Sequence, residues 1–296
     1  MARGKKGICD LPLPGLNLNN YVFLPNTLQH LRKTNHMENY LIIGGSGYLG
    51  AELARQMKPF GNVFSTYHNT PFPRGVKYDF FTDDIWKPIT DHKISTIIFA
   101  AVVARGRGEE DWEYVEAVER FVTDLESMGD VKLVFVSTDA VFSGEKGSYV
   151  ESDRTDAKST YGINVSLFED FIEHLLNIWA IIRVSYLYGN TESHRDKRIE
   201  KAWKIVESGQ RLERSDNIYK SPVYVSDAAK SVVNITTKRI GGFFHIPGRR
   251  MSIYDFYRER FEALEVPSDG LVAVSTPKDA GIPMDTSLGT ERMIRS

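Results

Sequence analysis

The residues best suited to chemistry begin with a glycine-rich stretch, Gly44-Gly45-Ser46-Gly47-Tyr48-Leu49-Gly50, between a short apolar run and a helical stretch. The spacing Gly44–x–x–Gly47–x–x–Gly50 leaves no side chain where a backbone must turn and approach a pyrophosphate. The N-terminus of the following helix offers N–H groups and a partial positive charge to phosphates. The alternative is a glycine-rich turn without a ligand, which the strand–helix placement disfavours. We therefore predict a dinucleotide-binding loop whose contacts come from Gly44, Ser46, Gly47, Tyr48, Leu49 and Gly50.

A second cluster, Ser137-Thr138-Asp139-Ala140-Val141-Phe142-Ser143-Gly144, lies at the end of a predicted strand. Tyr161 follows Thr138 by 23 residues and stands at the start of a predicted helix. A hydroxyl and a phenol that converge on one point can hold and protonate a carbonyl oxygen as a hydride arrives. Taken singly, a threonine after a strand is commonly a cap, and a tyrosine before a helix commonly packs. We predict Thr138 and Tyr161 as the catalytic pair.

The end of the second predicted strand should lie near an adenine ribose, where an acid favours a free 2′-hydroxyl. The sequence there is Ser65-Thr66-Tyr67-His68-Asn69, without an acid, whereas His68 and the more distant Arg74 can accept a 2′-phosphate. We therefore predict NADP in preference to NAD. Asp79-Phe80 either brackets the adenine or is an ordinary solvated strand end. The predicted cofactor contacts on strand ends are Tyr67, His68, Asp79, Phe80, Ala101 and Val102.

The elements that must position these groups alternate between strand and helix from residue 39 to residue 185. Short apolar runs predict strands at 40–44, 62–67, 94–102, 131–137 and 179–185, with helices at 48–58, 110–128 and 161–177. This alternation predicts an α/β fold of the Rossmann type, a doubly wound parallel sheet with helices on both faces. Ligands bind such folds at the carboxyl edge of the sheet.

The regularity weakens after about Gly189. Helices are predicted at 196–208, 226–236 and 252–264, the last two capped by Ser226 and Ser252, with a strand at 243–246. We expect a smaller C-terminal lobe against the carboxyl edge. The predicted division is residues 1–36 as a disordered extension, 37–190 as the dinucleotide-binding domain and 191–296 as mainly a substrate lobe. The extension has five basic residues against one acid, so a basic arm that contacts a partner is its alternative.

Composition narrows the classes of function. The 296 residues include 37 Lys and Arg against 39 Asp and Glu, a net charge of −2, which disfavours nucleic acid as a partner. The single cysteine, Cys9, cannot build a disulfide framework, and the seven histidines lack metal-ligand spacing, so no metal is predicted. The longest apolar run, Ile94–Ala104, falls well short of the roughly 20 residues that a membrane span needs. We predict a cytoplasmic protein that acts on a small molecule.

Five motifs occur in an order that resembles the extended short-chain dehydrogenase/reductase family. They are Gly44–Gly50, Ser137–Gly144, Tyr161-Gly162, Arg183–Gly189 and Ser221–Asp227. Within that family the chain resembles the dTDP-4-dehydrorhamnose reductase branch, in the pattern Ser-Thr-Asp-x-Val-Phe-x-Gly and in the closing segment Pro283–Leu288. The resemblance covers about residues 39–290. The same branch includes the regulatory β subunit of methionine adenosyltransferase.

The chain departs from the family at the catalytic lysine. The family pattern is Tyr–x–x–x–Lys, and here Val165 occupies the lysine position. Residues i and i+4 share one face of a helix, so a lysine there would stand beside the phenol of Tyr161, lower its pKa and hold the ribose. Lys158 precedes the helix and is a poor substitute. Glu116 replaces the family's asparagine, and Ile282 stands where the tail usually has arginine.

The resemblance implies a reductase that transfers hydride from NADPH or NADH to a keto group, on a nucleotide-linked 4-keto-6-deoxysugar. Tyr161 would protonate the oxygen and Thr138 would hold it. An untuned phenol, with a pKa near 10, is still protonated at pH 7, while loss of a general acid–base element costs about 10²–10⁴ in rate. A slow reductase, another reaction at the same site, and a non-catalytic dinucleotide-binding regulatory subunit all remain open, as do a homodimer and a regulatory partner protein.

Overall fold

The computed structural model describes residues 37–104 and 112–292. The predicted extension over residues 1–36 lies outside the described residues, as do the first two residues of the helix predicted at 110–128. Among the described residues, no helix is both long and apolar enough to cross a membrane.

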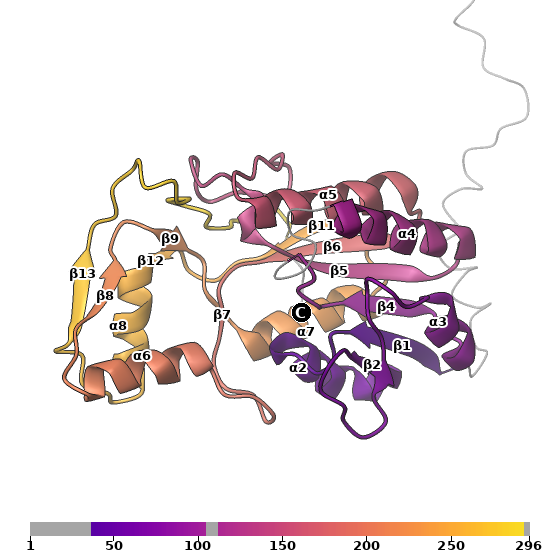
Figure 1. Cartoon of the computed structure of the whole chain (residues 1–296), viewed down its shortest axis with the longest axis horizontal. Coiled ribbons are helices and arrows are strands. Elements are labelled where there is room, and N and C mark those ends of the chain that lie inside the picture. Colours follow the sequence, from indigo (N-terminus) through magenta and orange to yellow (C-terminus); the bar gives the residue numbers. More distant parts are fainter. Residues whose placement is uncertain (1–36, 105–111, 293–296) are drawn as a thin grey trace, which may run out of the picture. The chain divides into compact units, whose positions relative to one another are not determined.

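The central element is a sheet of seven parallel strands in the order β11-β6-β5-β4-β1-β2-β3 (Figure 1). Strand β1 lies between β2 and β4, so the strand order reverses at β1, which creates the crevice where such folds bind ligands. The prediction of a doubly wound parallel sheet is confirmed. The strands are β1 Glu38–Ile43, β2 Gly61–Tyr67, β3 Val76–Lys77, β4 Thr96–Phe99, β5 Lys132–Thr138, β6 Trp179–Val184 and β11 Gly242–Ile246.

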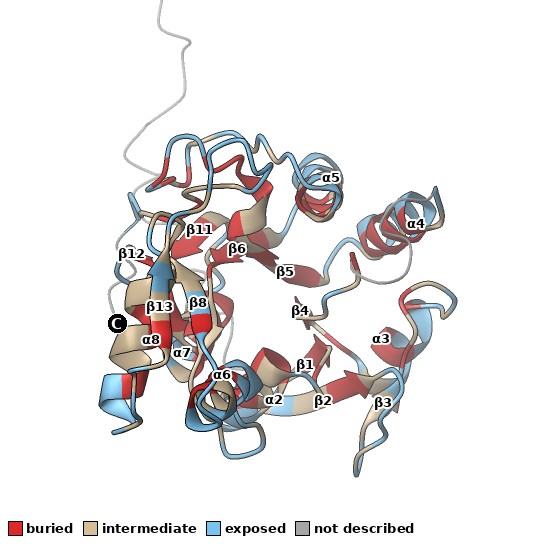
Figure 2. Ribbon diagram, turned by 60° about the vertical axis from the view of Figure 1, so that its left-hand side comes forward, coloured by how far each residue is buried: buried red, intermediate tan, exposed pale blue. Residues whose placement is uncertain are grey.

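Helices cover both faces of this sheet. Successive residues of a strand point to opposite faces, and here the side chains on both faces are apolar and pack against helices. Ile42 packs with helices α2 (Tyr48–Met57) and α7 (Val225–Thr237) on one face. Leu41 belongs to the other core, under helices α3 (Trp86–His92), α4 (Trp112–Met128) and α5 (Thr160–Leu175). Figure 2 shows buried residues on the strands and on the inner faces of the helices, with exposed residues outside.

A smaller lobe has its own core, in which Phe256 and Phe261 are buried. It contains α6 (Lys197–Glu207), α8 (Ile253–Ala263) and the parallel pair β8 (Leu212–Ser215) and β13 (Leu271–Val274). Two short ladders join it to the sheet region: β7 (Leu187–Tyr188) with β10 (Val223–Tyr224), and β9 (Tyr219–Lys220) with β12 (Met251–Ser252). Helix α7 and strand β11 belong to the main sheet layer, so the division at residue 190 cuts across the fold.

Two local predictions differ from the structure. Helix α7 begins at Val225 without a side-chain cap, so Ser226 lies inside its first turn, and the prediction of a Ser226 cap is wrong. The Ser252 cap is confirmed, because its hydroxyl accepts from the N–H of Asp255 at 3.0 Å. The strand predicted at 94–102 is limited to Thr96–Phe99, since its partner β1 ends at Ile43 and the ladder ends there.

Candidate active site

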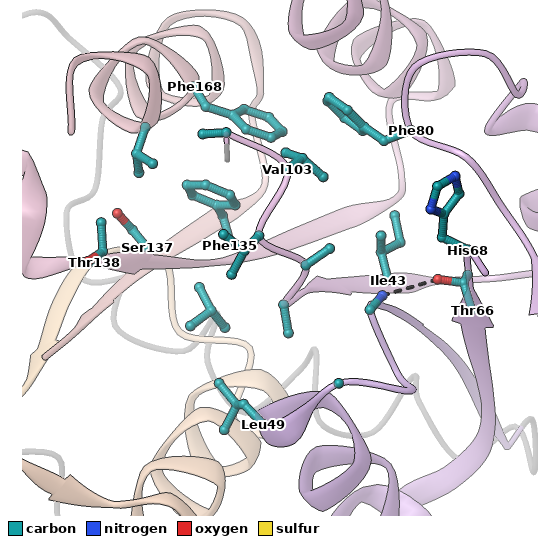
Figure 3. A pocket seen from close by; sticks show the side chains of 18 of the residues that line it. Ile43, Leu49, Thr66, His68, Phe80, Val103, Phe135, Ser137, Thr138 and Phe168 are labelled. Carbon is teal, nitrogen blue, oxygen red and sulfur yellow. Dashed lines mark hydrogen bonds between the residues drawn. The ribbon is translucent and has the colours of Figure 1, made fainter. Parts of the chain in front are cut away.

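A cleft of about 660 Å³ lies at the carboxyl ends of the central strands, and both chemical clusters line it. Figure 3 shows Ser137 and Thr138 at one end and Thr66 and His68 at the other. Gly50 and Tyr67 do not line the cleft, and the ring of Tyr67 packs on Phe72. The predicted residues that do line it are Gly44, Ser46, Gly47, Tyr48, Leu49, His68, Asp79, Phe80, Ala101, Val102, Thr138 and Tyr161.

Two glycines of the loop are required by the loop itself. Gly44 has a φ of +84°, and a Cβ there would lie 2.8 Å from the Cα of Ala101. A Cβ on Gly50 would lie 2.1 Å from the carbonyl oxygen of Gly44. The strand-to-helix turn can therefore close only without these two side chains.

Gly47 is less constrained, because its backbone does not require glycine and an added Cβ would make one tight contact, which a shift of a few tenths of an ångström relieves. Its φ of −81° is open to any residue, and an added Cβ would meet only the Gly44 oxygen, at 3.1 Å. Gly47 lines the cleft at the start of α2, whose N-terminus has no side-chain cap. A side chain here would fill the space in front of the helix N–H groups, so the loop fits a pyrophosphate.

The loop is tied to the segments on either side. The N–H of Gly44 donates to the hydroxyl of Thr66 at the end of β2, at 3.1 Å (Figure 3). The phenol of Tyr48 donates to the carbonyl oxygen of Gly189, and burial raises the pKa of this phenol. These two hydrogen bonds therefore join the loop to β2 on one side and, on the other, to Gly189 in the segment that leads to the smaller lobe.

His68 is a base that lines the end of the cleft near β2. Its Nε2 lies 3.1 Å from the Oδ2 of Asp79, which itself lines the cleft. Arg74 is exposed and does not line the cleft. Of the two bases predicted to accept a 2′-phosphate, the structure brings only His68 to the site.

Thr138 and Tyr161 line the same cleft, and the two short elements beside them pack backbone against backbone. Thr138 ends β5 and caps the 3₁₀ helix η3 (Asp139–Val141), with its hydroxyl oxygen accepting from the N–H of Ala140 at 3.2 Å. Tyr161 lies in the first turn of α5, where a Cβ on Gly162 would be 2.0 Å from the Ala140 oxygen. The start of α5 therefore rests directly on η3, and both residues line one cleft.

The lysine position is part of an apolar wall. Val165 is 6% exposed and lines the cleft with Phe135 and Phe168, whose ring centroids are 4.5 Å apart. Among the described lining residues, none is a lysine or an arginine. Lys158 forms an exposed ion pair with Glu145, so it does not replace the missing ammonium.

A buried polar network lies behind this wall. Glu169, two helical turns after Tyr161, accepts from the hydroxyl of Ser137 and forms an ion pair with Arg183 at 2.6 Å. Nη1 of Arg183 lies 3.3 Å from Nε2 of His245, whose Nδ1 faces the carbonyl oxygen of Tyr149 at 2.9 Å. Nδ1 is therefore the protonated nitrogen. Burial and the Arg183 charge lower the pKa of His245.

Sequence reasoning missed several aromatic residues of the lining, among them Tyr114, Phe135 and Phe168. Tyr114 from α4 donates its phenol hydrogen to the Asn164 oxygen at 3.0 Å, and burial raises its pKa. The apolar residues of β5 run continuously and are buried on both faces, so no pattern in the sequence indicated that Phe135 faces the cleft. No group of three or more His, Cys, Asp or Glu that could hold a metal occurs among the described residues. The other unpredicted lining residues include Thr66, Tyr78, Phe81, Val103, Ser137 and Ser185.

The chain belongs to the RmlD substrate binding domain family, which matches residues 38–295. It is similar to the spore coat polysaccharide biosynthesis protein SpsK of Bacillus subtilis, with 30% identity over 219 residues and 72% of each chain covered. Methionine adenosyltransferase 2 subunit beta of Danio rerio is 23% identical over 270 residues, with 86% of this chain and 83% of that protein covered. A hypothetical dTDP-4-dehydrorhamnose reductase from Sulfolobus tokodaii has a similar structure, with a TM-score of 0.71, 27% identity, and 84% and 91% coverage.

Proposed function

We propose that this protein is an NAD(P)H-dependent reductase of a keto group on a nucleotide-linked 4-keto-6-deoxysugar. The observation that carries the proposal is that Thr138 and Tyr161 line the same cleft as the glycine loop. Membership of the RmlD substrate binding domain family and similarity to the Sulfolobus tokodaii protein support it. The proposed place of action is the cytoplasm.

The residues at the loop fit a dinucleotide. The open N-terminus of α2 and the space in front of Gly47 would hold the pyrophosphate. Thr66, His68 and Asp79 would surround the adenosine. We favour NADPH over NADH because His68 can meet a 2′-phosphate, but the carboxylate of Asp79 beside it should make the preference small. The reduced nicotinamide, when bound, supplies the hydride.

Tyr161 and Thr138 carry the protein's own part of the reaction. The phenol of Tyr161 gives its proton to the substrate oxygen, and the hydroxyl of Thr138 donates a hydrogen bond to the same oxygen. Val165 supplies no ammonium at the lysine position of the family pattern, so this position adds nothing to the stabilisation of charge that develops on the oxygen. The proposed reductase is therefore slow.

The test is cofactor oxidation by the purified full chain with a panel of 4-keto-6-deoxysugar nucleotides. We expect turnover with at least one member, a loss of at least about 100-fold in Tyr161→Phe, and a smaller loss in Thr138→Val. Dinucleotide binding by calorimetry should be unchanged in both variants. Binding without turnover on the whole panel would contradict the proposal.

A second candidate is a dinucleotide-binding regulatory subunit. It is favoured by Val165 in the apolar wall, and by similarity to methionine adenosyltransferase 2 subunit beta. A methionine adenosyltransferase catalytic subunit mixed with this chain should then co-elute with it and change in activity. The change should require the dinucleotide and should be absent with Gly47→Val.

A further inference from the structure

The carboxylate next to Thr138 is held by an unusual number of donors. Asp139 is buried, and its Oδ2 accepts from the hydroxyl of Ser185 at 2.9 Å, the hydroxyl of Thr286 at 2.7 Å and the ammonium of Lys220 at 2.8 Å. Its other oxygen, Oδ1, accepts a long hydrogen bond from the hydroxyl of Thr138, at 3.3 Å. Asp139 therefore joins a predicted catalytic hydroxyl to three segments that are distant in the sequence.

Lys220 is the cation of this group, and it comes from β9 rather than from the helix that carries Tyr161. Its Nζ also donates to the hydroxyl of Thr286, at 2.6 Å. The side chain is 22% exposed and does not line the cleft. A buried carboxylate needs a partner charge, and Lys220 supplies it at Oδ2, whereas Thr138 contacts Oδ1.

These contacts determine which acceptors remain for the hydroxyl hydrogen of Thr138. The N–H of Ala140 donates to the Thr138 oxygen, so that the hydrogen is left to Oδ1 of Asp139 or to a substrate oxygen. The distance of 3.3 Å to Oδ1 exceeds the 2.5–3.0 Å of ordinary O–H···O bonds. A carboxylate that already accepts an ammonium and two hydroxyls attracts this hydrogen less than a bare one.

We propose that Lys220 is a positioning residue for the reduction: by neutralising Asp139 it keeps the hydrogen bond from Thr138 to Asp139 long, so that the Thr138 hydroxyl can turn to donate to the substrate oxygen. The inference rests on the proposed function. It assigns to the region of the smaller lobe a part in readying the catalytic hydroxyl. Tyr219, the neighbour of Lys220, is bonded through its N–H to the Met284 oxygen at 2.7 Å, so the closing segment fixes the same strand.

The test compares Lys220→Met with Lys220→Arg in the full chain. We expect Lys220→Met to lower kcat at least tenfold and Lys220→Arg to restore most of it, with the dissociation constant for the dinucleotide within twofold of the parent in both. In a Thr138→Val background the effect of Lys220→Met should fall below about twofold, because the hydroxyl on which it acts is absent. Equal losses in both backgrounds would overturn the proposal, since a merely structural contact gives independent effects.

A second measurement does not depend on turnover. A crystal structure of Lys220→Met should show Thr138 Oγ1 within 3.0 Å of Asp139 Oδ1, and that of Lys220→Arg should keep the longer separation. If Lys220→Met does not fold, Lys220→Gln replaces it, because an amide keeps a donor but removes the charge. A parent chain with no turnover on the panel refutes the proposed function. An active parent with an unimpaired Lys220→Met variant refutes only this inference.

Discussion

The two ends of the cleft differ in what determines their residues. At the glycine loop, Gly44 and Gly50 are required by main-chain contacts, and Gly47 leaves space for a ligand. At the other end Thr138 and Tyr161 line the cleft, and Val165 adds an apolar surface at the predicted lysine position. The difference teaches that main-chain contacts fix the glycine loop, whereas side chains alone set the chemical character of the other end.

The largest expected effect concerns the buried ion pair between Arg183 and Glu169, in the network behind the apolar wall. Arg183→Met leaves Glu169 as a buried charge without its partner and should lower the free energy of unfolding by about 3–5 kcal/mol. The matched variant Arg183→Met with Glu169→Gln should regain most of this loss, which chemical denaturation can measure. Equal stability of the two variants would mean that the unpaired carboxylate of Glu169 is not the source of the loss.

The next prediction tests whether Gly47 is needed for dinucleotide binding but not for folding. Gly47→Val should weaken dinucleotide binding at least 100-fold, about 2.8 kcal/mol, and change the melting temperature little. The control is Gly50→Ala, whose Cβ would meet the Gly44 oxygen at 2.1 Å and should reduce both binding and stability. Calorimetry and thermal denaturation give the two readouts. Unchanged affinity in Gly47→Val would remove the dinucleotide from this loop.

A third prediction tests whether a positive charge at position 165 speeds the proposed reduction. Val165→Lys should raise keto-substrate reduction at least about tenfold, equivalent to 1.4 kcal/mol of barrier, because an ammonium beside Tyr161 stabilises developing negative charge. The gain should vanish when Tyr161→Phe is added, and Val165→Met should give none. Some loss of stability is expected, since the wall of Phe135 and Phe168 solvates an ammonium poorly. A folded Val165→Lys variant that binds dinucleotide yet reduces nothing would favour the regulatory candidate.

The smallest effect is a pH dependence of stability. The pKa of His245 is held below its usual 6.5 by burial and by Arg183. Between that lowered value and 6.5 the unfolded chain binds the proton and the folded chain does not, so stability falls as the pH falls below about 6.5. The slope is at most about 1.4 kcal/mol per pH unit. Denaturation at several pH values should show a flatter slope in His245→Gln; an identical slope would assign it to other groups.

The parallel sheet and the glycine loop could be predicted from the sequence. The signals for them, apolar runs that alternate with helical stretches and the spacing of three glycines, can each be recognised within a short stretch of sequence. The end of β4 was not predictable, since it depends on where its partner β1 stops. The place of β11 in the main sheet was missed because a five-residue strand fits either lobe equally well. Lys220 and Asp139 are separated by 81 residues, and no local pattern couples them.

The contact of Gly162 with the Ala140 oxygen has an evolutionary consequence. Main-chain atoms set the separation between the start of α5 and η3, so this contact does not depend on the side chain at position 165. The residue at position 165 can therefore change over evolution while the first turn of α5, which carries Tyr161, keeps its place on η3.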